Sequence, residues 1–193
     1  QPELNGRSLF LSQGRVLGGG GSINGMVYTR GFPEDYEAWK AMGCDGWGYD
    51  DVLPVFKRSE GNFRGESAIH GGDGPLKVTG GRASRGLCGL ILEAAGQAGY
   101  KRIEDFAGPN ADGFGYYDFT ISGGKRVSAS AAFLHGKALK GHVTVWSGAD
   151  VAKVLIEKGR AVGVAFVRDG ISQTVRAERE VVVSGRAISS PKL

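Results

Sequence analysis

The chain has 193 residues, of which 41% are hydrophobic and 34 are glycine, and its formal net charge is +4. This length suits one domain or parts of two, and the scattered glycines exclude a collagen-like fibre and favour a loop-rich globular fold. The small charge without long Lys/Arg runs argues against nucleic-acid binding, and no apolar run approaches the roughly 20 residues that span a bilayer.

The N-terminal part is dominated by a glycine loop. Residues 8–12 (SLFLS) have the composition of a strand, and "GRVLGGGGSINGMVYTRG" follows at residues 14–31, with a helical turn expected at 22–29. Such a loop exposes backbone N–H groups and can hold an anion. It lacks the lysine of a P-loop after Gly25 and the G-x-G-x-x-G spacing. Spacing alone therefore leaves two alternatives, a ligand loop or close packing of two backbones.

Two helices are predicted next. Residues 33–42 (PEDYEAWKAM) begin with a proline and two acids, which suit a first helical turn. Residues 46–60 (GWGYDDVLPVFKRSE) predict a second helix with Asp50 as its N-cap, and Pro54 is expected to fit only within the first turn.

The middle of the chain is less regular. We expect a strand at 74–78, an amphipathic helix at 85–100 that Gly99 closes, a strand at 114–121, a turn at 123–124 and a helix at 128–139.

The C-terminal part changes to short β-rich runs separated by turn signals such as EKGR and RDGI. These runs predict a five-stranded β-meander, and the Val-rich last run is expected to be buried on both faces. The runs are residues 142–147, 151–159, 161–170, 172–178 and 179–185.

Cysteine and histidine offer no metal site. The chain contains only Cys44 and Cys88, and its three histidines lie far apart in sequence without metal-ligand spacing. Isolated cysteines without a signal peptide predict free thiols in a reducing compartment, and hence a cytoplasmic protein.

Several stretches together resemble the glucose–methanol–choline (GMC) family of flavin oxidoreductases. They occur in the family's order along nearly the whole chain. They are "GRVLGGGGSINGMVYTRG", "FPEDYEAWKAMGCDGWGYDDVLPVFKRSE", "HGGDGPLKV", "FGYYDFTISGGKRVSASAAFL", "VTVWSGADVAKVLIEKGRAVGVAFVRDG" and "REVVVSGRAISSPKL". The first is similar to the first family signature, and the last to the start of the second.

The resemblance implies a mixed α/β fold in three segments. Residues 1–75 would supply part of a Rossmann-like FAD domain with the glycine loop and a helical flavin lid. Residues 76–140 would belong to the substrate-binding domain, and 141–193 would return to the FAD domain as a β-meander and strand. The family's G-x-G-x-x-G unit would precede Gln1, and its catalytic histidine would follow Leu193, so the chain is expected to be an internal fragment that is inactive alone.

The resemblance also implies which residues contact FAD. The glycine loop would lie against the pyrophosphate and the flavin ring, and a strand residue further on would meet the adenine through its backbone. The expected residues are Val16, Gly18, Gly19, Gly20, Gly21, Asn24, Gly25, Met26, Val27 and Val151. For Met26, Val27 and Val151, ordinary core packing is the alternative interpretation.

Other positions refine this expectation. Ile23 stands where some family members carry a histidine bonded to the flavin, so the resemblance implies non-covalent FAD. Arg186 replaces a family glycine that lies in a tight bend near the flavin, and a large cation there would crowd the cofactor. His70 is expected to be a hydrogen-bonded structural histidine, and Arg126 and Ser128 are assigned no catalytic role.

The expected function follows from the family. The whole protein would oxidise the CH–OH group of a small alcohol, with choline-like or other alcohol substrates, by hydride transfer to the flavin, and its electron acceptor is not specified. Two alternatives stay open: an FAD-containing lyase of the hydroxynitrile type, and a non-catalytic flavin-binding fragment.

Overall fold

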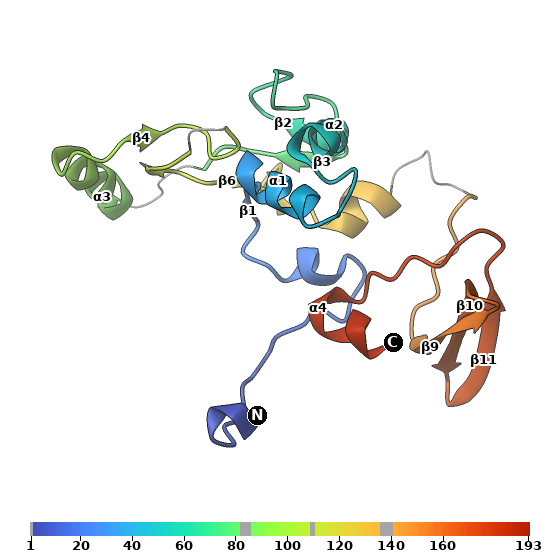
Figure 1. Ribbon diagram of the computed structural model, residues 1–193. Coiled ribbons are helices and arrows are strands. Elements are labelled where there is room, and N and C mark those ends of the chain that lie inside the picture. The colour runs from blue at the N-terminus through green and yellow to red at the C-terminus, as the bar shows by residue number, and fades with distance from the viewer. Residues whose placement is uncertain (1, 82–85, 109–110, 136–140) are drawn as a thin grey trace. The chain divides into compact units, whose positions relative to one another are not determined.

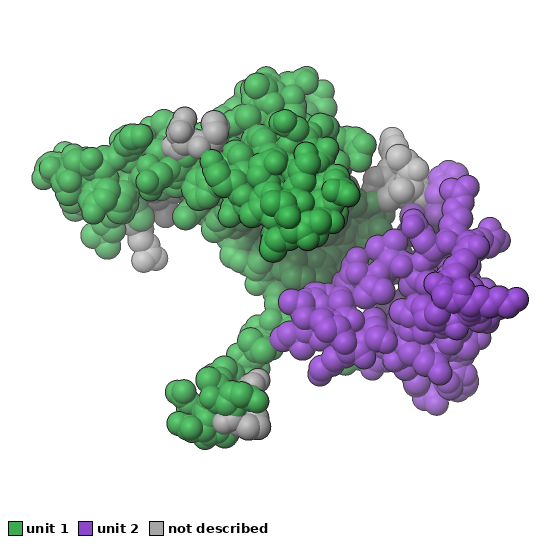
Figure 2. Space-filling model, in the orientation of Figure 1, with its two compact units in different colours: residues 1–140 green, residues 141–193 purple. Residues whose placement is uncertain are grey.

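The computed structural model describes residues 2–81, 86–108, 111–135 and 141–193 (Figure 1). The chain forms two compact units, residues 1–140 and 141–193, which are coloured separately in Figure 2. Short helices and strands are mixed within it, which confirms the predicted α/β class. Across those described ranges, no helix combines the length and the apolarity needed to cross a membrane.

The first unit begins with little regular structure. A 3-10 helix η1 (Pro2–Leu4) is followed by residues 8–12, which form no strand, and Phe10 there is 92% exposed. The predicted strand is wrong because a strand requires a hydrogen-bonded neighbour, whatever its composition. The predicted helical turn lies earlier than expected, as the 3-10 helix η2 (Gly19–Ser22), and β1 (Val27–Tyr28) follows it as a strand.

The two predicted helices both form. Helix α1 (Pro33–Ala41) begins where the Asp35 carboxylate accepts a hydrogen bond from the Phe32 N–H at 2.8 Å. Helix α2 (Tyr49–Ser59) begins after Gly48 instead, because the carboxylate of Asp51 accepts from the Gly48 N–H at 3.1 Å. The assignment of Asp50 as the N-cap is therefore wrong.

The position of the proline in α2 also differs from the prediction. Pro54 lies inside the helix, beyond its first turn. A proline there leaves the carbonyl four residues earlier, that of Asp50, without its helical partner. Asp50 is exposed, so water can satisfy this carbonyl and the helix continues.

Small two-stranded sheets complete the first unit. Two of the sheets are antiparallel: β1 pairs with β6 (Asp118–Phe119), and β7 (Ile121–Ser122) pairs with β8 (Lys125–Arg126). The other two are parallel: β2 (Glu60–Asn62) pairs with β3 (Leu76–Val78), and β4 (Arg102–Ile103) pairs with β5 (Phe114–Gly115). The predicted strand at 74–78 is confirmed at its C-terminal end. The single strand predicted at 114–121 is wrong, because it is divided among β5, β6 and β7.

The turn and helix predictions of this region are largely confirmed. Helix α3 (Gly86–Gln97) is followed by Gly99 at φ +87°, as expected of a C-terminal glycine. Gly123 and Gly124 have φ of +55° and +73° and form the two-residue turn of the β7–β8 hairpin. The helix predicted at 128–139 appears as a short π-helix η3 (Ser130–Leu134), and residues 136–139 lie outside the described residues.

The second unit is a three-stranded antiparallel sheet. The strands β9 (Asp150–Glu157), β10 (Arg160–Arg168) and β11 (Ile171–Arg176) are joined by two-residue turns with positive φ at both positions, followed by α4 (Arg186–Ser189) and the 3-10 helix η5 (Ser190–Lys192). Residues 142–147 and 179–185 form no strand, so two of the five predicted strands are wrong. Val182 is 77% exposed, which contradicts the predicted burial on both faces.

The buried side chains are partly polar. The apolar ones are Tyr36, Val78, Ala95, Ile103, Ala111 and Ala132 in the first unit and Phe166 in the second. Phe166 packs against Trp146 with ring centroids 5.5 Å apart. Buried polar side chains include Glu60, Asn62 and His70, which lie on and beside β2. The polar groups of this part of the first unit therefore require partners.

Candidate functional site

The glycine loop is a compact turn held by its own backbone. Gly18 and Gly19 have φ of +87° and +53°, which glycine adopts without steric cost. The Gly21 N–H donates to the Gly18 carbonyl at 3.0 Å, and the Asn24 N–H donates to the Gly20 carbonyl at 2.9 Å. The Ser22 hydroxyl donates to the Leu17 carbonyl at 2.8 Å. The four glycines therefore form an ordered turn with a defined path.

The loop has a packed side and an open side. A Cβ at Gly18 would lie 3.1 Å from the Ser128 side chain, and a Cβ at Gly21 would lie 3.2 Å from the Ala129 nitrogen. A Cβ at Gly20 or Gly25 would meet no atom within 4 Å. The close-packing interpretation of the loop therefore holds for Gly18 and Gly21, while the backbone at Gly20 and Gly25 is open.

The segment of residues 24–27, which follows the loop, contains one strained backbone conformation. Met26 has φ +62°, a left-handed conformation that is uncommon for a residue with a side chain. Asn24 Oδ1 accepts a hydrogen bond from the Met26 N–H at 3.1 Å, and the Met26 carbonyl accepts from the Thr120 N–H at 2.9 Å. Arg126 Nη1 donates to Asn24 Oδ1 at 2.7 Å and to the Asn24 carbonyl at 2.8 Å. Polar contacts from Thr120 and from Arg126 on β8 thus hold this segment.

The predicted cofactor residues other than Val151 are neighbours in the sequence, within residues 16–27 of the first unit. Val16 and Val27 are 59% and 46% exposed, so neither is a core residue. Val151 lies in the second unit, on β9, where it pairs with Phe166 and lines a cavity of about 460 Å³ together with residues 181–185. Val151 is 43% exposed, so its side chain is not fully packed into the sheet.

Arg186 adopts a backbone conformation that favours glycine. Its φ is +69°, in the left-handed region where a Cβ is unfavourable and glycine is favoured. This backbone geometry agrees with the tight bend that the family resemblance implies at this position.

A buried network of charged groups lies at the end of α2. Glu60 is fully buried, and its carboxylate accepts from Arg30 Nη2 at 2.7 Å, Asn62 Nδ2 at 2.9 Å and the Gly71 N–H at 2.9 Å. His70 is 3% exposed and lies between two carboxylates, with Nδ1 3.1 Å from Glu60 and Nε2 2.7 Å from Asp105. His70 is therefore a hydrogen-bonded structural histidine, as predicted.

The surroundings lower the pKa of both carboxylates in this network. Burial raises the pKa of Glu60, but the hydrogen bonds from Asn62 and the Gly71 N–H and the charge of Arg30 outweigh it. Burial likewise raises the pKa of Asp105, and its hydrogen bonds outweigh that effect, with His70 contributing most. Both groups are thus held in their ionised form.

The network predicts loss of stability in acid. A carboxylate whose pKa is lowered by folding contributes stability above its unfolded pKa, and this contribution is lost as the pH falls through the folded pKa. We expect the melting temperature to fall as the pH decreases below about 4.5, the range of unperturbed carboxyl groups. Asp105→Asn should flatten this dependence in thermal melts between pH 7 and pH 3. A melting temperature that rises over this acidic range would contradict the prediction.

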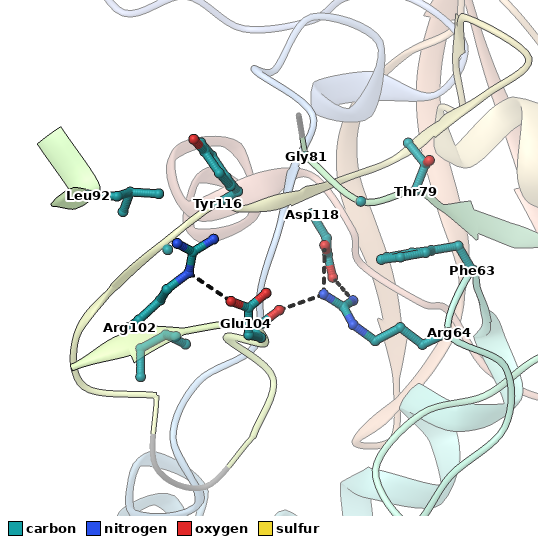
Figure 3. Close-up of a pocket in the computed structure, with 12 residues that line it drawn as sticks. Phe63, Arg64, Thr79, Gly81, Leu92, Arg102, Glu104, Tyr116 and Asp118 are labelled. Atoms are coloured by element: carbon teal, nitrogen blue, oxygen red, sulfur yellow. Dashed lines mark hydrogen bonds and ion pairs between the residues drawn. The ribbon is translucent and has the colours of Figure 1, made fainter. Parts of the chain in front are cut away.

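A separate cavity of about 350 Å³ lies in the first unit (Figure 3). The Arg64 guanidinium pairs with the Asp118 carboxylate, donates to the Glu104 carbonyl at 2.7 Å and lies 4.3 Å from the Phe63 ring centroid. Arg102 donates to the Glu104 carboxylate at 2.8 Å. The sequence analysis did not predict that these residues line a cavity, because local patterns cannot show contacts between partners as far apart as Arg64 and Asp118, which are separated by 54 positions. The contacts join distant segments of the unit.

The part of the chain that the structure describes contains no cluster of metal-binding side chains. No cluster of three His, Cys, Asp or Glu side chains there could hold an ion. Cys44 and Cys88 are free and exposed.

Comparisons with known proteins give a consistent relationship. The sequence model of GMC oxidoreductases matches residues 2–193. Mitochondrial choline dehydrogenase of Homo sapiens is 45% identical over 100% of the chain, and oxygen-dependent choline dehydrogenase of Rhizobium etli is 43% identical over 100%. The chain spans 32% and 35% of these two relatives, about a third of their length.

Solved structures show the same fold. Pyridoxine 4-oxidase from Mesorbium loti superposes with a TM-score of 0.78 at 31% identity, over 85% of this chain and 33% of that one. An FAD-dependent oxidoreductase from Chaetomium thermophilum superposes with a TM-score of 0.89 over 98% of this chain and 35% of that one, at 24% identity, which shows the fold alone. Because the family match covers residues 2–193, the chain belongs to the GMC oxidoreductase family.

Proposed function

We propose that the chain supplies the cofactor-binding glycine loop of an FAD-dependent oxidoreductase that acts on the CH–OH group of a small alcohol. The observation that carries this proposal is the match to the GMC oxidoreductase family over residues 2–193. The bare backbone at Gly20 and Gly25, where an added Cβ would meet no atom within 4 Å, leaves room for the cofactor in the loop. A bulky anionic cofactor requires such close approach to backbone N–H groups. The relatives named choline dehydrogenases, at 43% and 45% identity, support choline or a similar alcohol as the substrate.

The open backbone at Gly20 and Gly25 suits such a cofactor. The glycines would approach its pyrophosphate and ring, the backbone of Asn24 to Val27 would meet its polar edges, and the Val151 backbone would meet its adenine. The residues proposed to hold FAD are Val16, Gly18, Gly19, Gly20, Gly21, Asn24, Gly25, Met26, Val27 and Val151. Bound FAD would supply the hydride acceptor, while this chain's residues position it.

Domain organisation and location are further parts of this proposal. Segments 1–75 and 141–193 would belong to the FAD domain and 76–140 to the substrate domain. The free, exposed thiols of Cys44 and Cys88 support a reducing compartment such as the cytoplasm, although the human relative is named as mitochondrial.

The open side of the loop can be tested with Gly20→Ala. The φ of Gly20 is not in the left-handed region, and an added methyl group has space, so the FAD-free protein should keep its melting temperature. The methyl group would stand between the backbone and the cofactor, and we expect the Kd for FAD to rise about tenfold or more. The measurement is flavin fluorescence quenching with the full-length protein.

Gly89→Ala is the matched control, because an added Cβ on this α3 residue also meets no atom within 4 Å. Its Kd for FAD should equal that of the wild type. Equal FAD affinity in Gly20→Ala and the wild type would refute the proposed placement of the cofactor.

We further propose that FAD is held without a covalent bond. Ile23 is 50% exposed beside the glycine turn and has no nucleophilic atom that could attach to a flavin. Acid precipitation should therefore release all flavin into the supernatant, and Ile23→His provides a comparison that restores an imidazole. Flavin absorbance in the washed wild-type pellet would show that a covalent link exists.

A further inference from the structure

One side chain connects the glycine loop to a distant hairpin. Arg126, on β8, uses a single nitrogen, Nη1, to reach Asn24 Oδ1 at 2.7 Å, the Asn24 carbonyl at 2.8 Å and the Gly21 carbonyl at 3.3 Å. These acceptors lie more than 100 positions away in sequence. The contact therefore joins the end of the glycine turn to the β7–β8 hairpin.

The Arg126 contact acts on the most strained part of the loop. Asn24 Oδ1 accepts from both Arg126 and the Met26 N–H, so the arginine fixes the same oxygen that holds Met26 in its left-handed conformation. The donor is charged, and charge-assisted hydrogen bonds are shorter and stronger than neutral ones. The Asn24 carbonyl is held by the same nitrogen, so both the side chain and the backbone of Asn24 are fixed.

The opposite side of Met26 is also held. Its carbonyl accepts from the Thr120 N–H at 2.9 Å, and Val27 begins the pairing of β1 with β6. Without Arg126, Asn24 would keep its N–H bond to the Gly20 carbonyl and the bond that its Oδ1 accepts from the Met26 N–H. It would lose the two contacts that tie its side chain and its carbonyl to the β7–β8 hairpin. The backbone at 24–26 could then leave the conformation in which its polar groups are arranged for a ligand.

We propose that Arg126 is a positioning residue for the cofactor: it holds Asn24 and thereby the backbone of residues 24–26 in the conformation that receives FAD. This inference rests on the proposed function. Arg126 acts through Asn24, so the cost of its loss should appear as weaker FAD binding and not as global unfolding. Prearranged polar groups bind more tightly because no ordering is needed on binding.

The test compares Arg126→Ala, Arg126→Lys and Lys125→Ala in the full-length protein. Lys125 is the matched control, because it is an exposed cation on the same strand. We expect Arg126→Ala to raise the Kd for FAD about tenfold and to shift the visible flavin spectrum, while the FAD-free melting temperature stays near that of the wild type. Arg126→Lys should restore much of the affinity, because an ammonium group can still donate to Asn24.

Hydrogen exchange supplies a readout without the cofactor. In the FAD-free protein, the Met26 amide should exchange faster in Arg126→Ala than in the wild type or in Lys125→Ala. An unchanged Kd in Arg126→Ala, an equal loss in Lys125→Ala, or unchanged exchange at Met26 would each overturn the positioning role. A wild-type protein that binds no FAD would instead overturn the proposed function on which the comparison depends.

Discussion

Replacing Glu60 with alanine is expected to destabilise the protein by about 3–5 kcal/mol, because removal of one partner from a buried ion pair leaves the other charge uncompensated. The Arg30 side chain is 3% exposed and would lose its ion pair with the Glu60 carboxylate. Its Nε–H is already buried without a hydrogen-bond partner among the described residues. His70, Asn62 and the Gly71 N–H would lose the same acceptor.

Equilibrium denaturation of the full-length protein measures this effect. Glu104→Ala is the control, because that carboxylate pairs with Arg102 at 2.8 Å but is 80% exposed. Exposed pairs contribute only about 0–1 kcal/mol. Glu60→Gln keeps the shape of the side chain and removes its charge, so its free energy of unfolding should lie between those of Glu60→Ala and Glu104→Ala. Similar free energies of unfolding for Glu60→Ala and Glu104→Ala would show that the buried network does not stabilise the fold.

Gly71→Ala is expected to produce the second large loss, of several kcal/mol, and to leave little folded protein. A Cβ at this glycine would overlap the Lys57 carbonyl oxygen and would also lie 2.8 Å from the Glu60 carbonyl oxygen. Backbone atoms cannot move aside as a flexible side chain can, so the loop and the end of α2 would have to separate. That separation would also break the hydrogen bond from the Gly71 N–H to Glu60.

Gly96→Ala is the matched substitution for this test. Its Cβ would meet no atom within 4 Å, and it lies within α3, where alanine is favoured over glycine by about 1 kcal/mol. Soluble yield and denaturant midpoint should therefore fall for Gly71→Ala and hold or rise for Gly96→Ala. A Gly71→Ala protein with wild-type stability would mean that this close approach is relaxed in solution.

Local signals in the sequence predicted the elements that depend on neighbouring residues. Pro33 with the acids after it marks the start of α1, and Gly99 marks the end of α3. The glycine pair 123–124 forms the expected hairpin turn. Each of these signals acts within a few residues, because helix starts, helix ends and tight turns are determined by local φ, ψ and hydrogen bonding.

Strand predictions failed where pairing was required. Residues 8–12 and 179–185 have strand-like composition, yet neither pairs with a neighbouring strand within the described residues, and Phe10 and Val182 are exposed. Composition describes how well a residue suits a sheet, and a partner strand decides whether the sheet forms.

The sequence by itself determined the family and the position of the glycine loop, because these are properties of contiguous residues. Only the tertiary structure decided which loop glycines pack and which stay open, and it alone joined Arg126 to Asn24. It also gathered Arg30, Glu60 and His70 into one buried network. These groups are far apart in the chain, and burial makes such pairing obligatory, since an unpaired charge or polar group in the interior carries a large desolvation cost.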